Sequence, residues 1–179
     1  SKAEEVEELV KKLLAEVKKS LDDVRRTVEK LLREVRKSLR DHMVLHEYVN
    51  AAGITLKDDG QDERAVRRVV EEIKELLDRN NEDSKRVVKE IRKLLDENDK
   101  TSKRVVEEIK RLLDEVRKEG KISEEKVEKL ERDVRRALER DTRENKKLED
   151  RVETALREDK KRNDDLREDV KRVLEEIRT

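Results

Sequence analysis

The sequence predicts an all-α fold, namely a single-chain antiparallel up-down-up three-helix bundle with long straight helices. Charged residues make up 55% of the chain and hydrophobic residues 32%, whereas globular domains average about 25% charged residues. The apolar residues nevertheless recur at helical spacing, which a disordered chain has no reason to keep. Two short turn-like segments divide the chain into three parts of similar length.

The turn-like segments lie at residues 57–61 and 119–123. The first is rich in Asp and Gly, and Asp62 is the expected N-cap of the helix that follows. In the second, Gly120 is placed to end one helix and Ser123 to cap the next. We therefore expect helices at residues 2–57, 62–119 and 124–178, within one domain that spans residues 1–179. Similar lengths suit an up-down-up bundle, because unmatched ends would expose apolar residues.

An internal repeat indicates that the helices are straight. The pattern Val-Val-x-Glu-Ile-x-x-Leu-Leu begins at residues 69, 87 and 105, eighteen residues apart. The third helix repeats Leu130, Leu148 and Leu166 with the same period. Eighteen residues make five turns at about 3.6 residues per turn, so the apolar stripe keeps its direction without a supercoil. Repeats this regular are typical of parametric design.

The charge balance and the lack of apolar runs exclude several kinds of partner. Forty-nine basic residues offset forty-nine acidic ones, so no net field would attract nucleic acid or an anionic membrane. No apolar run approaches the roughly 20 residues that span a bilayer, and the N-terminal residues lack the apolar core of a signal peptide. We expect a synthetic, soluble monomer without a natural compartment, cytoplasmic where it is expressed.

Ten polar residues lie within the apolar stripes when the helices are projected at about 100° per residue. Antiparallel pairing through the two turns places them at two heights. The first polar layer comprises Ser20, Asn98, Ser102, Asp141 and Asn145. The second polar layer comprises Ser38, Asn80, Ser84, Asp159 and Asn163. We expect two buried hydrogen-bond networks that specify helix register, in which each unsatisfied buried group would cost about 1–3 kcal/mol.

A catalytic or metal site is the alternative interpretation of these layers. Each layer contains one carboxylate and no His or Cys, which suits no transition metal and offers no nucleophile–base pair. His42 and His46 stand at i and i+4, a spacing that can bind zinc from one helix face. No third ligand is expected to converge on them. We therefore expect neither enzymatic activity nor a cofactor nor a metal.

Segment 40–55 departs from the composition of the rest of the chain. It contains both histidines, the only Met and the only Tyr, and it has several poor helix formers. Among these, Gly53 alone costs about 1 kcal/mol relative to Ala in a helix. The segment comprises Arg40, Asp41, His42, Met43, Val44, Leu45, His46, Glu47, Tyr48, Val49, Asn50, Ala51, Ala52, Gly53, Ile54 and Thr55. Stability alone does not explain this choice of residues.

All of segment 40–55 resembles the eleventh β-strand of green fluorescent protein, in the form that serves as the small fragment of a split reporter. The rest of the chain resembles, in style only, designed helical bundles and the cage-and-latch switches built from them. The resemblance implies that the segment can add as a strand to a fragment holding the other ten strands. It further implies that Glu47 joins the hydrogen bonds at the chromophore and that Val49 points into the barrel. The chromophore-forming tripeptide is not in this chain, so the resemblance implies no fluorescence from the chain alone.

As a helix, segment 40–55 would present a different face from the one it presents as a strand. Strand alternation groups Asp41, Met43, Leu45, Glu47 and Val49. Continuing the helical stripe instead directs inward His42, His46, Val49, Asn50 and Gly53, with Met43 and Leu45 at the edges and Val44, Glu47 and Tyr48 outward. The surface expected to face them comprises Val66, Val69, Ile73, Leu76, Leu77, Leu166, Val170, Val173, Leu174 and Ile177. Length matching favours the helix, because a first helix ending near Leu39 would leave about five turns of its partners uncovered.

The leading hypothesis is a designed reporter switch that holds segment 40–55 as a helix and releases it to complement a split fluorescent-protein fragment. Its expected partners are the ten-strand fragment and a peptide that displaces the first helix. The alternative is a protein that does not switch, either a test of a chameleon sequence or a structural scaffold with a detection tag.

Overall fold

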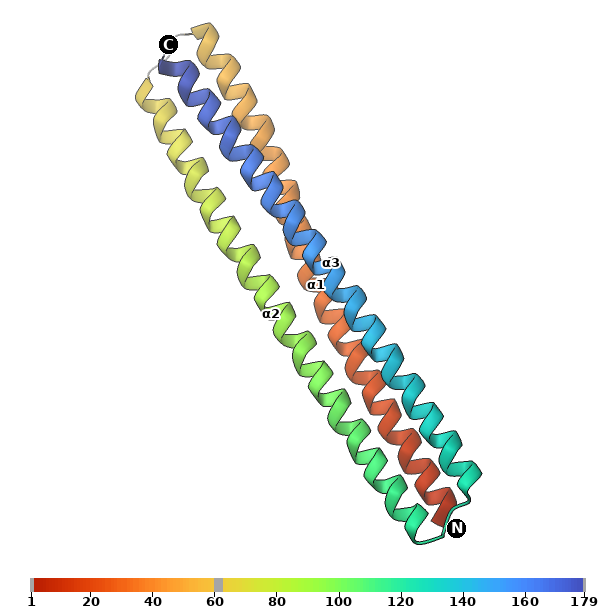
Figure 1. The fold of residues 1–179 in the computed structure, drawn as a ribbon. Helices are drawn as coiled ribbons and strands as arrows, with labels where there is room; N and C mark the ends of the chain where they lie inside the picture. The colour runs from red at the N-terminus through yellow and green to blue at the C-terminus, as the bar shows by residue number, and fades with distance from the viewer. Residues whose placement is uncertain (1, 60–62, 179) are drawn as a thin grey trace. The chain divides into compact units, whose positions relative to one another are not determined.

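The structure, a computed structural model, describes the backbone of residues 2–59 and 63–178. Side chains are described in this range except at residues 38–39, 42, 46, 48–50, 52–59, 63, 65–66 and 176–178. The described chain forms three α-helices and no β-strand, which confirms the predicted all-α three-helix fold (Figure 1). The helices are α1 (Lys2–Asp59), α2 (Glu63–Lys118) and α3 (Glu124–Arg178).

The turn between α2 and α3 follows the local rules that its sequence suggests. Gly120 adopts a positive φ of 64°, and its backbone N–H donates to Arg117 O at 3.2 Å. A left-handed residue ends a helix in this way, and glycine adopts that conformation without a Cβ penalty. Ser123 Oγ then accepts a hydrogen bond from the backbone N–H of Lys126 at 3.3 Å and caps α3. Both predictions for this turn, the helix end at Gly120 and the cap at Ser123, are confirmed.

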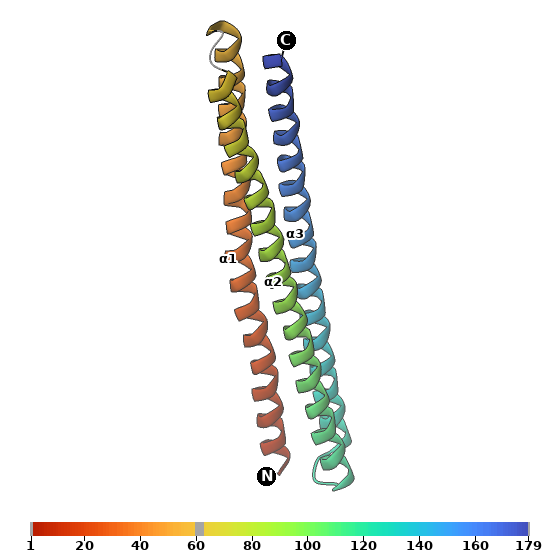
Figure 2. The ribbon, with the colours of Figure 1, turned by 90° about the vertical axis from the view of Figure 1, so that its left-hand side faces the viewer.

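The described helices fall into two compact units. Unit 1 comprises residues 1–29 and 91–150, and unit 2 comprises residues 30–90 and 151–179. In unit 1 the turn at residues 119–123 joins adjacent ends of α2 and α3, so these helices are antiparallel (Figures 1 and 2). Each unit contains residues from all three helices, so each has its own packing and its own polar layer.

The core of unit 1 draws on every helix. One cluster of buried side chains there contains two residues of α1, four of α2, and four from the turn and α3. They are Val6, Val10, Val106, Ile109, Leu113, Val116, Ile122, Val127, Leu130 and Val134. Removing this apolar surface from water makes the main favourable contribution to the free energy of folding, at about 25 cal/mol per Å² of apolar area. Because all three helices contribute buried side chains, α1 is an integral part of this unit.

Unit 2 has buried side chains from all three helices. One buried cluster contains Val70, Ile73 and Leu77 of α2 with Leu166, Val170 and Val173 of α3. Among the side chains that the structure describes, α1 adds only the half-buried Leu45 to this cluster. Leu32 and Val35 of α1 are buried elsewhere in the unit.

Candidate functional site: segment 40–55 and the two polar layers

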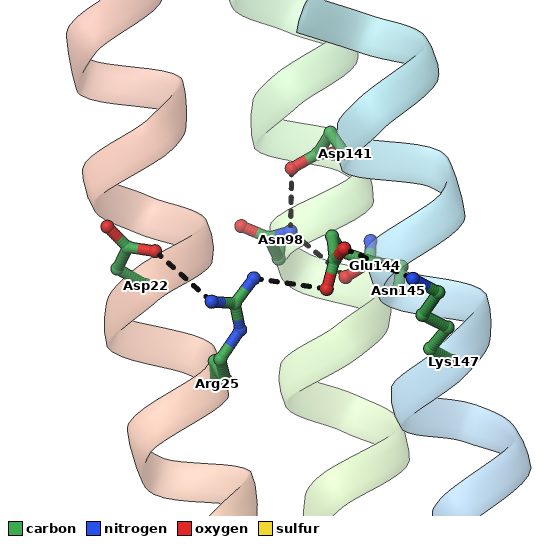
Figure 3. A network of polar contacts seen from close by, with 7 residues as sticks. All are labelled: Asp22, Arg25, Asn98, Asp141, Glu144, Asn145 and Lys147. Carbon is green, nitrogen blue, oxygen red and sulfur yellow. Dashed lines mark hydrogen bonds and ion pairs between the residues drawn. The ribbon is translucent and has the colours of Figure 1, made fainter.

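Asn98 is the centre of the first polar layer, in unit 1. Its side-chain oxygen accepts a hydrogen bond from Ser20 Oγ at 2.8 Å. Its Nδ2 donates to Asn145 Oδ1 at 3.3 Å and to Asp141 Oδ1 at 3.5 Å, as Figure 3 shows. One amide thus connects α1, α2 and α3. An amide can do this because it offers an acceptor and two donors at the same time.

Asp141 is the one carboxyl group of this layer, and it is buried. Burial raises the pKa of Asp141, while hydrogen bonding with Ser102 and Asn98 lowers it and the nearby charge of Asp99 raises it further. Asp141 Oδ2 and Ser102 Oγ are both buried without a geometrically formed hydrogen bond. The Ser102 hydroxyl is therefore near enough to stabilise the carboxylate but poorly aligned with it.

Charged side chains that the helical pattern does not single out lie beside the first polar layer. Arg25 of α1 donates to Glu144 of α3 at 3.1 Å, and its other nitrogen lies 3.9 Å from Asp22 (Figure 3). Lys147 lies 3.6 Å from the same Glu144. Nothing in the local pattern distinguishes Arg25 from the many other arginines. Partly exposed pairs of this kind contribute about 0.2–1 kcal/mol, so their role is secondary to that of the buried amides.

The second polar layer, in unit 2, is organised around Asn163. Ser84, Asp159 and Asn163 are buried, and Asn80 is half-buried. Asn163 Nδ2 donates to the backbone carbonyl of Leu77 at 3.0 Å, which links α3 to α2. Arg167 Nε donates to Asn163 Oδ1 at 2.7 Å and its Nη2 contacts Asp78. The side chain of Ser38, the expected α1 member of this layer, lies outside the described residues.

The backbone of segment 40–55 is helical and forms part of α1. Its described side chains are mostly exposed, including Met43 at 53% and Val44 at 66%. Glu47 is also exposed and Leu45 is half-buried, as the helical stripe indicated. The expected inward residues (His42, His46, Val49, Asn50 and Gly53) and the outward Tyr48 have side chains outside the described set.

Leu76 lies on the facing surface, as the sequence predicts, but at its open edge. It lines a groove with Val44 and Leu45 of the segment, and 44% of it is exposed. The neighbouring Ile73 and Leu77 are buried against α3. The reason is geometric: a stripe that contacts two partners is limited in width, and Leu76 stands at its margin beside Val44 and Leu45 in an open groove. Val44, within the segment, and Leu76, which faces it, therefore leave apolar surface exposed to water.

The described residues give little support for a metal site or for a membrane-spanning helix. Among them, no three His, Cys, Asp or Glu side chains gather closely enough to hold a metal ion. None of the described helices combines the length and the apolar content that crossing a bilayer requires. The side chains of His42 and His46, the pair weighed as zinc ligands, lie outside the described residues.

Comparison with known proteins gives a likeness among solved structures and none among protein families or curated proteins. No protein-family model and no curated protein matches the chain. A solved structure described as a computationally designed three helix bundle aligns with a TM-score of 0.46 and 15% identity. The alignment covers 98% of this chain and 83% of that one.

Proposed function

We propose that this chain is a designed switch, which holds a fluorescent-protein strand sequence as a helix and releases it to a complementary ten-strand fragment. The observation that carries the proposal is the conflict within segment 40–55. Its residues resemble a fluorescent-protein β-strand, whereas its backbone lies within α1. The eighteen-residue repeat and the absence of Cys, Pro, Phe and Trp support a designed origin.

The burial pattern along α1 supports a helix that is held firmly before the segment. Val28, Leu32 and Val35 are almost fully buried. After residue 40 the described side chains are exposed, apart from the half-buried Leu45. Apolar surface left in water contributes nothing to docking. The described side chains of the segment, apart from Leu45, therefore add little to its docking.

Release must be complete for strand addition to occur. Segment 40–55 is about 24 Å long as a helix at 1.5 Å per residue, and about 53 Å long as a strand at 3.3 Å per residue. Every backbone group that bonds within the helix must also exchange its partner for one in the barrel. The segment cannot satisfy both structures at once. Fluorescence with the ten-strand fragment would therefore report the population of the undocked state.

The decisive experiment is a time course of fluorescence after the protein is mixed with the ten-strand fragment. Ile73→Ala removes a side chain from the unit 2 core without altering the segment. Ile109→Ala is its matched control, since Ile109 occupies the equivalent place two repeats later and is buried in unit 1. We expect Ile73→Ala to raise the complementation rate by about tenfold, the effect of ~1.4 kcal/mol on the docking equilibrium. Ile109→Ala should change the rate much less.

Two results would contradict this proposal. Immediate maximal fluorescence in the unmutated protein would mean that the segment is never withheld. No fluorescence with Ile73→Ala, even when a peptide copying residues 2–39 is added to displace α1, would favour the protein that does not switch. Free peptide of segment 40–55 serves as the positive control for the fragment.

A further inference from the structure

A groove between α1 and α3 in unit 2 has an unusual charge for this chain. Five basic residues line it: Arg33, Arg36, Arg40, Lys161 and Arg162. Only two acidic residues, Glu158 and Asp165, line it with them. The chain as a whole carries no net charge. The excess of three positive charges is therefore a local feature and does not follow from composition.

Three other grooves of the described chain are close to balanced in charge. The groove beside Val44 and Leu76 has three basic and three acidic residues. The groove between α2 and α3 in unit 1 has two of each, and the one beside Leu14 has three basic and two acidic. Pairing of opposite charges is thus the usual arrangement on this surface, and the groove at Arg36 departs from it.

The five basic side chains also lack partners of their own. None forms a hydrogen bond or an ion pair with any residue that the structure describes. Elsewhere arginines do form ion pairs with acidic residues, such as Arg25 with Glu144 and Arg117 with Glu131. Because the basic side chains from the two helices outnumber the acidic ones, the unbalanced positive charges repel one another, which weakens the contact between α1 and α3 in this groove.

We propose that this groove binds a chain of phosphoryl groups, inorganic or nucleotide, which bridges α1 and α3. Arg33, Arg36 and Arg40 stand at i, i+3 and i+7 and so share one face of α1. They extend over about 10 Å of helix axis, which exceeds what a single phosphate can contact. Guanidinium groups bind phosphate oxygens through paired N–H donors. Lys161 and Arg162 would contact the same anion from α3.

The bridging anion would hold the start of segment 40–55 against α3, because Arg40 is both a groove residue and the first residue of the segment. A ligand that binds only the docked state shifts the equilibrium toward it. Polyphosphate should therefore slow release of the segment. This consequence rests on the proposed function, whereas the binding itself does not.

The test is calorimetric titration of the full chain with sodium tripolyphosphate, a nucleoside triphosphate and orthophosphate, at constant ionic strength. We expect saturable tripolyphosphate binding that is about tenfold tighter than orthophosphate binding. Arg36→Gln combined with Arg162→Gln should weaken it by about tenfold or more. Lys37→Gln combined with Arg79→Gln is the matched control, because both residues line the balanced groove of the same unit. The control should bind as the parent does.

Hydrogen exchange provides the second measurement, which needs no reporter fragment. Tripolyphosphate should slow amide exchange at residues 33–47 in the parent and in the control, but not in the groove variant. Equal loss of affinity in both variants would overturn the proposal, as would slowing of exchange by sodium chloride alone at matched ionic strength. Binding of the nucleotide without binding of tripolyphosphate would also overturn it, since the phosphate chain would then not be the recognised group.

Discussion

Ser20 Oγ donates a hydrogen bond of 2.8 Å to Asn98 Oδ1, and the two residues lie 78 positions apart in the chain. The contact joins α1 to α2 inside the core of unit 1, where the surrounding side chains are mainly Val, Leu and Ile. An amide buried there is stable only while its partners stay in place, because water cannot replace them. The contact therefore specifies which residues of the two helices stand opposite each other.

Asn98→Ala should destabilise unit 1. The substitution removes the partner of Ser20, Asp141 and Asn145 together, and each buried group left unsatisfied costs about 1–3 kcal/mol. Urea denaturation followed by circular dichroism measures the loss, with Arg104→Ala on the exposed face of α2 as the control. A loss no larger than that of the control would show that the layer contributes nothing to stability.

Asp141 should make unit 1 more stable at mildly acidic pH than at neutral pH. Its folded-state pKa is raised by burial, so the folded protein holds the proton more tightly than the unfolded chain does. The stabilisation that comes from this tighter proton binding is complete below the unfolded-state pKa of about 3.9. It is lost as the pH rises through the folded-state pKa. Asp141→Asn removes this titration.

Denaturation midpoints of the parent and Asp141→Asn, compared between about pH 4 and pH 7.5, measure the effect. As the pH rises, the parent should lose stability relative to Asp141→Asn. A constant difference across this range would mean that Asp141 does not titrate differently on folding.

Arg167→Lys should weaken the contact between α2 and α3 in unit 2. The guanidinium contacts Asn163 and Asp78 at once, and a single ammonium group cannot reproduce that fork. We expect a loss of about 0.5–1.5 kcal/mol. Arg172→Lys is the control, because Arg172 pairs with Asp169 of its own helix, three residues away. Equal losses of stability in the two variants would show that the contact between α2 and α3 contributes no more than a pair within one helix.

Gly120→Ala should destabilise the turn between α2 and α3 through backbone conformation alone. An added Cβ would meet no atom within 4 Å, so no clash contributes. The positive φ of 64° is what disfavours alanine, at about 1–2 kcal/mol. Gly120→Asn should cost less, since asparagine tolerates this conformation better. Thermal unfolding of the two variants tests the order, and an alanine variant as stable as the asparagine variant would contradict it.

The fold was predictable because each helix carries its own signals. The eighteen-residue repeat, the two turns, Gly120 and Ser123 are local features, and local rules were enough to interpret them. The polar residues could be sorted by height because straight helices of known length have a simple geometry. The members of the first polar layer, taken from three helices, lie together through Asn98.

The sequence alone determined that residues 40–55 form a helix, because a shorter first helix would leave the ends of α2 and α3 uncovered. Only the tertiary structure decided which side chains do the covering. It left Leu76, Met43 and Val44 exposed, and it placed Arg36 and Arg162 in one groove with an excess of positive charge. Periodicity determines which face a residue is on, but not how wide the buried part of that face is. The width depends on the distance and rotation of two neighbouring helices, which are properties of the assembled packing.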